Sequence, residues 1–268
     1  MNSIKKMMLS GALGCLISGM AYADGSSPQP VKPYWQDIQV VAVNKEKPRS
    51  SFMSYADRET ALTSRFEKSP YYSLLNGTWK FFFVDSYKDL PQNITDPSVN
   101  TSSWDDITVP GNWEVQGHGV AIYTNHGYEF KPRNPQPPLL PEANPVGVYR
   151  RDIEIPANWD NRDIYLHIGG AKSGLYVYLN GKEVGYSEDS KNPAEFLINK
   201  YLQPGKNVLT LKIFRWSTGS YLECQDFWRM SGIERDVFLW SQPKASIQDF
   251  RVVSTLDERI RMESSNWR

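Results

Sequence analysis

A series of short strand-like segments separated by turn signals most constrains what this chain can fold into. Residues 207–214 alternate apolar and polar side chains. Residues 175–179 and 183–186 flank Asn180-Gly181, a dipeptide typical of a two-residue β-hairpin turn. Further strands are expected at residues 148–155 and 164–168. Short strands, frequent turns and almost no helical periodicity predict an all-β sandwich.

The stretch that follows these strands, residues 215–237, is too aromatic for an ordinary solvated loop. Its aromatic side chains are expected to pack against the domain, and they are Trp216, Tyr221, Phe227 and Trp228. Its arginines are expected to form ion pairs within the same run, Arg215, Arg229 and Arg235 with Glu223, Asp226, Glu234 and Asp236. Buried charge is tolerated when it is paired and hydrogen-bonded. We therefore predict a structured crossover with a packing role rather than a direct part in catalysis.

Charge and length narrow the functional classes. The 268 residues include 30 basic and 30 acidic side chains, so the formal net charge is zero. A nucleic-acid-binding protein would show a basic patch or stripe, so that class is not expected. The length suffices for one large domain or two small ones with a sizeable apolar core.

The first 23 residues are predicted to be a signal peptide. Lys5 and Lys6 form a basic start, and the apolar residues 7–20 are too few to span a bilayer. Residues 21–23 read Ala-Tyr-Ala, a small-x-small cleavage site. The mature chain would begin near Asp24 and be exported, to the periplasm or outside the cell, with no transmembrane segment.

A lipoprotein signal is the alternative processing of this leader. Residues 13–15 read Leu-Gly-Cys, and Cys15 would then carry a lipid that attaches the protein to the outer membrane. The apolar run continues past Cys15 to the peptidase site, which favours simple cleavage. After that cleavage Cys224 is the single remaining cysteine, so no intrachain disulfide is expected. Cys224 is expected to be a packed thiol.

Three further blocks have a distinctive sequence. Residues 75–81 read Leu-Asn-Gly-Thr-Trp-Lys-Phe, residues 109–113 read Val-Pro-Gly-Asn-Trp, and residues 122–125 read Ile-Tyr-Thr-Asn. Together with residues 185–191 and 215–237, these blocks resemble the N-terminal domain of the large bacterial β-galactosidases of glycoside hydrolase family 2. The resemblance covers most of the chain after the leader.

This resemblance implies a galactose-binding-like jelly roll, an all-β sandwich, over residues 66–242. An extended arm over residues 24–65 would precede it, with a helical turn near residues 56–62, and would lie on the surface of something larger. Residues 131–145 carry six prolines. Proline cannot continue a helix or a central strand, so this segment is expected to be a rigid loop inside the domain.

The last residues are expected to open a second domain. Residues 243–268 would be the start of a truncated immunoglobulin-like β-sandwich, beginning with a strand at residues 245–254. Residues 261–268 do not look like the continuation of that domain. A lone strand does not fold by itself, so the sequence predicts a chain that stops just inside its second domain.

The resemblance also implies two substrate-binding residues. Asn125 matches the family asparagine that contacts the bound galactoside, and Asp189 matches the aspartate that hydrogen-bonds the sugar and ligates a sodium ion. An amide offers a donor and an acceptor, and a carboxylate accepts from two hydroxyls or binds a hard cation. Taken without the resemblance, both residues favour roles in turns.

No catalytic residue is expected in this chain, because both catalytic glutamates of the family lie on a (β/α)8 barrel beyond its end. By resemblance, the full enzyme would hydrolyse terminal non-reducing β-D-galactose residues in β-D-galactosides with retention. It would use Mg and Na ions, with the Mg site outside this chain, and would form a homo-oligomer. The alternative is a non-catalytic exported module that binds carbohydrate or forms an oligomer interface.

Overall fold

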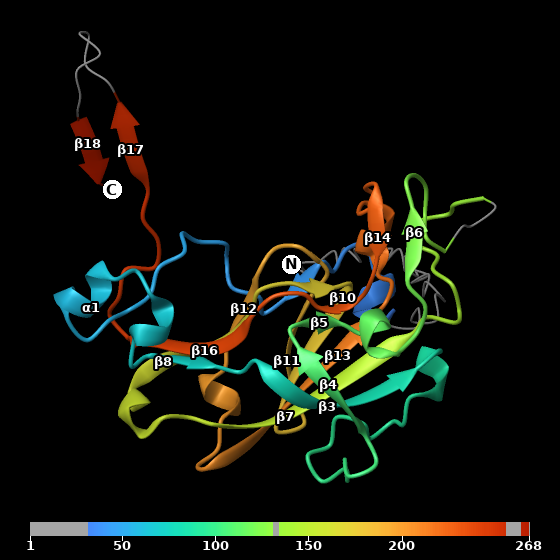
Figure 1. The fold of residues 1–268 in the computed structure, drawn as a ribbon, viewed down its shortest axis with the longest axis horizontal. Coiled ribbons are helices and arrows are strands. Elements are labelled where there is room, and N and C mark those ends of the chain that lie inside the picture. The colour runs from blue at the N-terminus through green and yellow to red at the C-terminus, as the bar shows by residue number, and fades with distance from the viewer. Residues whose placement is uncertain (1–31, 131–133, 256–263, 268) are drawn as a thin grey trace, which may run out of the picture. The chain divides into compact units, whose positions relative to one another are not determined.

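The computed structural model describes residues 32–130, 134–255 and 264–267, and two antiparallel sheets dominate it (Figure 1). The predicted signal peptide, and with it the two processing alternatives, lies outside these residues. The larger sheet has the strand order β1 (Ala42–Val43), β11 (Lys182–Ser187), β10 (Gly174–Leu179), β13 (Lys206–Phe214), β7 (Val146–Glu154), β3 (Gly77–Val84) and β4 (Asp105–Val109). The second sheet has the order β12 (Ala194–Leu197), β8 (Arg162–Ile168), β16 (Val237–Pro243) and β2 (Tyr72–Leu74).

Smaller elements complete the described part of the chain. Three minor sheets pair β14 (Phe227–Arg229) with β6 (Ile122–Thr124), β15 (Gly232–Ile233) with both β5 (Gly111–Asn112) and β9 (Ala171–Lys172), and β17 (Val252–Thr255) with β18 (Ser264–Trp267). The helices are α1 (Arg58–Leu62) and the 3-10 turns Tyr34–Gln36, Phe66–Lys68, Tyr87–Asp89, Glu114–Gln116, Ala157–Trp159, Asn199–Tyr201 and Thr218–Tyr221. None of the helices among the described residues is long and apolar enough to cross a membrane.

The predicted all-β sandwich is confirmed, and so is the hairpin that anchored the prediction. Strands β10 and β11 pair in antiparallel register on either side of Asn180 and Gly181. Both turn residues have positive φ, 53° and 78°, as a two-residue turn that follows the right-handed twist of the strands requires. The local sequence therefore determines this part of the fold.

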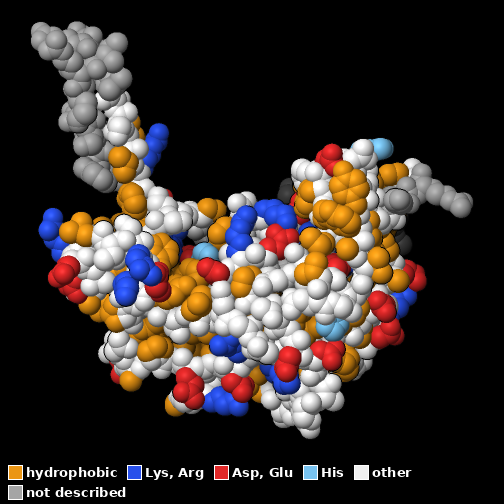
Figure 2. Space-filling view, viewed as in Figure 1, with side chains coloured by type: hydrophobic (Ala, Val, Ile, Leu, Met, Phe, Trp, Pro, Cys, Tyr) orange, Lys and Arg blue, Asp and Glu red, His pale blue; other side chains and the backbone are white. Residues whose placement is uncertain are grey.

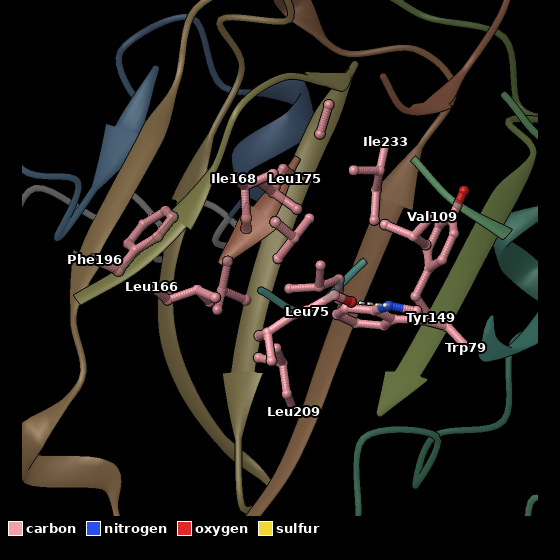
Figure 3. Close-up of a cluster of buried hydrophobic side chains, with 14 of the residues drawn as sticks. Leu75, Trp79, Val109, Tyr149, Leu166, Ile168, Leu175, Phe196, Leu209 and Ile233 are labelled. Carbon is pink, nitrogen blue, oxygen red and sulfur yellow. Dashed lines mark hydrogen bonds between the residues drawn. The ribbon is translucent and has the colours of Figure 1, made fainter. Parts of the chain in front are cut away.

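The core lies between the two sheets. Phe81 and Leu211 come from the larger sheet, and Leu166 and Phe196 come from the smaller one, and all four are buried. Burying a side chain of this size contributes about 1.5–3 kcal/mol relative to leaving it in water. Figure 3 shows part of this cluster, with Leu166 and Phe196 from the smaller sheet and Leu175 and Leu209 from the larger one. In the same view the Trp79 indole N–H donates to the Leu75 carbonyl at 2.8 Å. That bond satisfies the polar edge of a ring that is otherwise buried in the core.

The arm joins the larger sheet directly. Trp35 is 2 % exposed and stacks on Phe214 with ring centroids 5.0 Å apart. Strand β1 extends the sheet edge by pairing with β11. Further along, the predicted helical turn is present as α1, which Asp57 caps by accepting from the Thr60 amide at 2.7 Å. The first part of the arm thus belongs to the sandwich.

The crossover at residues 215–237 is structured, as expected, but two details of the prediction are wrong. Trp228 is 52 % exposed instead of packed. Its place in the short strand β14 explains this, because alternate side chains of a strand point to opposite faces, and the buried Arg229 takes the inward one.

The second error concerns the ion pairs. Arg215 lies 3.6 Å from Glu114 and 3.6 Å from Glu129, both outside the crossover. Arg229 and Arg235 donate to backbone carbonyls rather than to the neighbouring carboxylates. The remaining crossover acids bond elsewhere: Glu223 to Ser190, Asp226 to Tyr123, Glu234 to Lys191 and Asp236 to Asn76. Charges close in sequence point in different directions along an extended chain, so all of these residues except Arg229, which donates to the Glu223 carbonyl, have a partner outside the crossover.

The C-terminal end also differs from the prediction. The strand is shorter than the expected residues 245–254, since only β17 (Val252–Thr255) has strand structure. It is not alone, because β18 (Ser264–Trp267) pairs with it in antiparallel register. The tail therefore supplies the hydrogen-bonding edge that a lone strand would lack.

Glu195 on β12 ties the arm to the smaller sheet. Its carboxylate accepts from Arg49 at 3.1 Å through both oxygens, from the His167 ring at 2.8 Å and from the Trp240 indole at 3.1 Å. Burial raises the pKa of the Glu195 carboxyl, but hydrogen bonds and charge from His167 and Arg49 more than offset this and leave the pKa below its usual range. The folded state therefore favours the ionised form.

Glu195→Gln is expected to lower the free energy of unfolding at pH 7 by about 1–3 kcal/mol, because it weakens hydrogen bonds made to a charged acceptor. A carboxyl with a depressed folded-state pKa contributes stability above its unfolded pKa of about 4.3, and that contribution is lost as the pH falls through the folded value. Urea denaturation of both proteins from pH 7 into the acid range should show the difference shrinking. A constant difference would contradict this, and the exposed Glu154→Gln serves as control.

Candidate functional site

Asp189 lies in the loop that joins β11 to β12, residues 188–193, called here the Asp189 loop. Its side chain is 48 % exposed, and the Asn192 amide donates to its two oxygens at 3.1 and 3.0 Å. The Lys45 ammonium of the arm lies 4.0 Å from one oxygen. Burial lowers the pKa of Lys45, and the Asp189 charge partly offsets that effect. The carboxylate is thus oriented from two sides while one face remains in solvent.

The residue before Asp189 is anchored inside the domain. Glu188 is 4 % exposed and accepts from the Tyr186 hydroxyl at 2.7 Å, the Thr218 hydroxyl at 2.6 Å and the Gly219 amide at 2.8 Å. Burial raises the pKa of the Glu188 carboxyl, and these hydrogen bonds partly offset it. Thr218 and Gly219 belong to the crossover, so Glu188 fixes the start of the Asp189 loop to the crossover.

The residues after Asp189 are held by the same crossover. The Ser190 amide and hydroxyl both donate to the Glu223 carboxylate, at 3.0 and 2.6 Å. The Lys191 ammonium pairs with Glu234 at 2.5 Å, and Arg235 donates to the Lys191 carbonyl. Glu188, Ser190 and Lys191 are therefore all held by the crossover, which gives the crossover a supporting role for the Asp189 loop.

A cavity of about 380 Å³ opens beside the loop. Asp189, Asn192 and Lys45 form part of its polar wall, and Phe52 and Phe238 form part of its apolar wall. Pockets that hold small organic ligands combine such walls. Asp189 thus borders a space in which a polar group could reach it.

Asn125 occupies a different place in the fold. It directly follows β6, is exposed, and its side-chain oxygen Oδ1 lies 2.7 Å from the His126 ring nitrogen Nδ1. It lines a second cavity of about 620 Å³, together with Tyr123 and Tyr128. The two predicted substrate-binding residues border separate cavities, so their joint role in one sugar site stays a prediction.

The described residues supply only part of a ligand set for the sodium ion that the resemblance implies. Hard cations take several oxygen ligands, and no cluster of three or more His, Cys, Asp or Glu side chains suited to a metal occurs in the described parts of the chain. Asp189 offers one carboxylate, and the Lys45 ammonium faces it. These residues alone do not form a coordination shell for the ion.

Glu188 and Glu223 were given no site role by sequence reasoning. An acidic residue just after a strand is normally solvated, and nothing local in the sequence marks Glu188 as buried. The link between Ser190 and Glu223 joins residues 33 positions apart, so it depends on the tertiary fold. The density of aromatic and charged residues in the crossover was the available signal, and it indicated packing without naming what is packed.

A family model matches most of the described sandwich. Residues 72–243 match the model of the glycosyl hydrolases family 2 sugar binding domain. The chain therefore belongs to glycosyl hydrolase family 2, and the matched region contains both predicted site residues.

The relatives define the particular branch. The chain is 41% identical over 228 residues to a beta-galactosidase of Priestia megaterium, which covers 84% of this chain and 22% of that protein. It is 39% identical over 223 residues to a beta-galactosidase of Psychromonas ingrahamii, covering 83% and 21%. The chain thus spans about a fifth of the length of the curated relatives it matches. The predicted resemblance to the N-terminal region of β-galactosidases is confirmed.

Solved structures share the fold at lower identity. A beta-glucuronidase from an uncultured Clostridium sp. superposes with a TM-score of 0.52 at 23% identity, covering 70% of this chain and 31% of that one. A beta-glucuronidase of Bifidobacterium dentium, solved with coumarin-3-O-glucuronide, gives 0.51 at 19%, covering 70% and 32%. At this identity the likeness concerns the fold alone.

Proposed function

We propose that this chain is the N-terminal, sugar-binding part of a β-galactosidase that hydrolyses terminal non-reducing β-D-galactose residues in β-D-galactosides. The observation that carries the proposal is its identity of about 40% to proteins named beta-galactosidase, over more than four-fifths of this chain. The two catalytic glutamates would lie outside this sequence. The crossover-anchored Asp189 loop supports the proposal, because a substrate-binding carboxylate needs a fixed position.

In this proposal Asp189 accepts hydrogen bonds from sugar hydroxyls and contributes one oxygen to a sodium ion, whose other ligands come from elsewhere in the protein. Asn125 contributes an amide that both donates and accepts. The Mg ion of the full enzyme would be bound outside this chain. Export and assembly into a homo-oligomer are further parts of the proposal, drawn from the leader and from the family resemblance.

The test uses the native full-length protein, captured with an antibody against this domain, and compares chromogenic β-galactoside with the matching β-glucuronide. We expect hydrolysis of the galactoside and little of the glucuronide. Preference for the glucuronide, or hydrolysis of neither, would overturn the proposed activity. The isolated 268-residue chain is the second sample. Hydrolysis by that chain would show that the catalytic carboxylates are not outside it.

A further inference from the structure

The arm forms one wall of the cavity beside Asp189. Nine consecutive arm residues, 45–53, line that cavity, and the opposite wall comes from the Asp189 loop and the smaller sheet. Figure 2 shows hydrophobic side chains gathered on the face where β8 and β16 lie, with charged side chains beside them. Residues 45–53, called here the strap, have neither helix nor strand structure. The position of the strap therefore determines whether the cavity is closed on that side.

The first half of the strap is attached to the smaller sheet. The Glu46 amide donates to the Glu195 carbonyl at 2.8 Å. The Arg49 guanidinium pairs with the Glu195 carboxylate and lies 4.3 Å from the centroid of the Trp240 ring. An irregular segment is held by such individual contacts rather than by a ladder of backbone hydrogen bonds.

The second half of the strap is attached to a different part of the chain. Residues 244–251, called here the linker, connect β16 to β17. The Ser50 amide donates to the Asp249 carboxylate at 2.8 Å, and the Ser50 hydroxyl donates to the Phe250 carbonyl at 2.8 Å. The rings of Phe52 and Phe250 pack with centroids 5.5 Å apart. The hydrogen bond from the Ser50 amide holds the pKa of the Asp249 carboxyl below its usual range, so the folded state favours the ionised acceptor.

We propose that the strap is a lid over the cavity beside Asp189, hinged at Arg49 and held closed by the linker. The hinge is enclosed, because the side chains of Arg49 and Glu195 are 16 % and 12 % exposed. The contacts with the linker lie at the surface, since residues 244–251 are exposed. Contacts open to solvent break more readily than enclosed ones, so the linker end of the strap opens first.

Opening of that end uncovers the apolar part of the cavity. Phe52 and Met53 both line the cavity, and Met53 is 8 % exposed when the strap is closed. The linker leads directly into β17, so a shift of the chain after β16 moves the contacts that hold the strap. The position of the C-terminal part of the chain thus controls access to the cavity. This control of access goes beyond the proposed hydrolase function and does not depend on it.

Peroxide oxidation of Met53 measures how often the lid opens. Hydrogen peroxide transfers one oxygen to an accessible thioether and leaves as water, whereas an enclosed methionine reacts only on exposure. The 268-residue chain is treated with peroxide, and mass spectrometry follows the sulfoxide in each methionine peptide. Met230 of the crossover is the internal reference, because it does not line this cavity. The ratio of the two rates therefore reports on the strap.

We expect Asp249→Ala and Phe250→Ala each to raise the Met53 rate relative to Met230 by about tenfold, since each removes one contact of the closed strap. Asp249→Asn keeps an oxygen that can accept from the Ser50 amide, so it should raise the rate less than Asp249→Ala.

Asp96→Ala is the matched control, because the exposed Asp96 accepts from the Ser98 amide at the same 2.8 Å but does not line the cavity. It should leave the ratio unchanged. An unchanged ratio in both linker variants would overturn the lid, since the strap would then stay closed without the linker. A rise of Met53 and Met230 oxidation by the same factor would also overturn it, because the linker would then stabilise the whole domain. Since hydrolysis is not measured here, this test and that of the proposed function can fail separately.

Discussion

Arg215→Met is expected to lower the free energy of unfolding by about 3–5 kcal/mol, a large part of the stability of a typical domain. Arg215 is 4 % exposed in its side chain and lies 3.6 Å from both Glu114 and Glu129, whose side chains are equally enclosed. Burial raises the pKa of the Glu114 carboxyl, with the Ser231 amide and Arg215 acting against that rise. Removing the guanidinium leaves two buried carboxylates with one fewer counter-charge, which is the costly outcome.

The same substitution also removes two hydrogen bonds that hold the crossover. Arg215 donates to the carbonyls of Val120 and Arg229, at 2.9 and 3.2 Å. Urea denaturation measured by fluorescence gives the change. Lys206→Met is the matched control, because the Lys206–Asp152 pair is of the same kind but solvent-exposed on both sides. Exposed pairs contribute little, so the control should keep its midpoint. A loss in Arg215→Met as small as that in the control would contradict the prediction.

The β10–β11 hairpin and the ion pairs of Arg215 show which parts of the fold the sequence predicts and which it does not. The β10–β11 hairpin depends on Asn180-Gly181 and the strands beside it, so neighbouring residues suffice to predict it. The partners of Arg215 lie on segments about a hundred residues earlier in the chain, and the tertiary fold brings Glu114 and Glu129 to within 3.6 Å of it. Composition indicates that the crossover is packed and charged. Only the tertiary arrangement decides which acid meets which arginine.

The candidate site likewise has one part that the sequence predicts and another that depends on the tertiary fold. Asp189 and Asn125 could be named from short motifs and a family resemblance, since each belongs to a run of characteristic residues. What fixes Asp189 could not be named, because Glu188 and Glu223 have no local signature and act across the fold. For Trp228 the sequence led to a definite prediction, and that prediction is wrong. An aromatic residue in an aromatic run was predicted to be buried, whereas the period of β14 turns it to solvent.

Glu223→Gln is expected to reduce kcat/KM for a β-galactoside in the full-length protein by about 10–100-fold, the range seen when a supporting partner of a functional ligand is lost. Glutamine has nearly the same size, but one of its two polar ends is an NH2 group. The Ser190 amide and hydroxyl both donate to Glu223, so a glutamine that keeps its oxygen toward the amide turns its NH2 to the hydroxyl, which must change from donor to acceptor, and the negative charge of the acceptor is lost. Ser190 would then shift, and Asp189 with it. Glu183→Gln on β11 is the control, since Glu183 is exposed and its bond from the Tyr178 hydroxyl is long, at 3.3 Å.

A double-mutant cycle decides whether Glu223 acts through Asp189. If its role is to position that carboxylate, Glu223→Gln should cost little in an Asp189→Asn background, because the group being positioned is already lost. Additive losses would show that Glu223 supports activity by another route. Unchanged kcat/KM in the single variant would show that the Asp189 loop keeps its place without this contact. The unfolding midpoint and the Glu183→Gln control report any loss of folded protein. Such a loss lowers the rate by the same factor in both backgrounds, so it does not appear as coupling between Glu223 and Asp189.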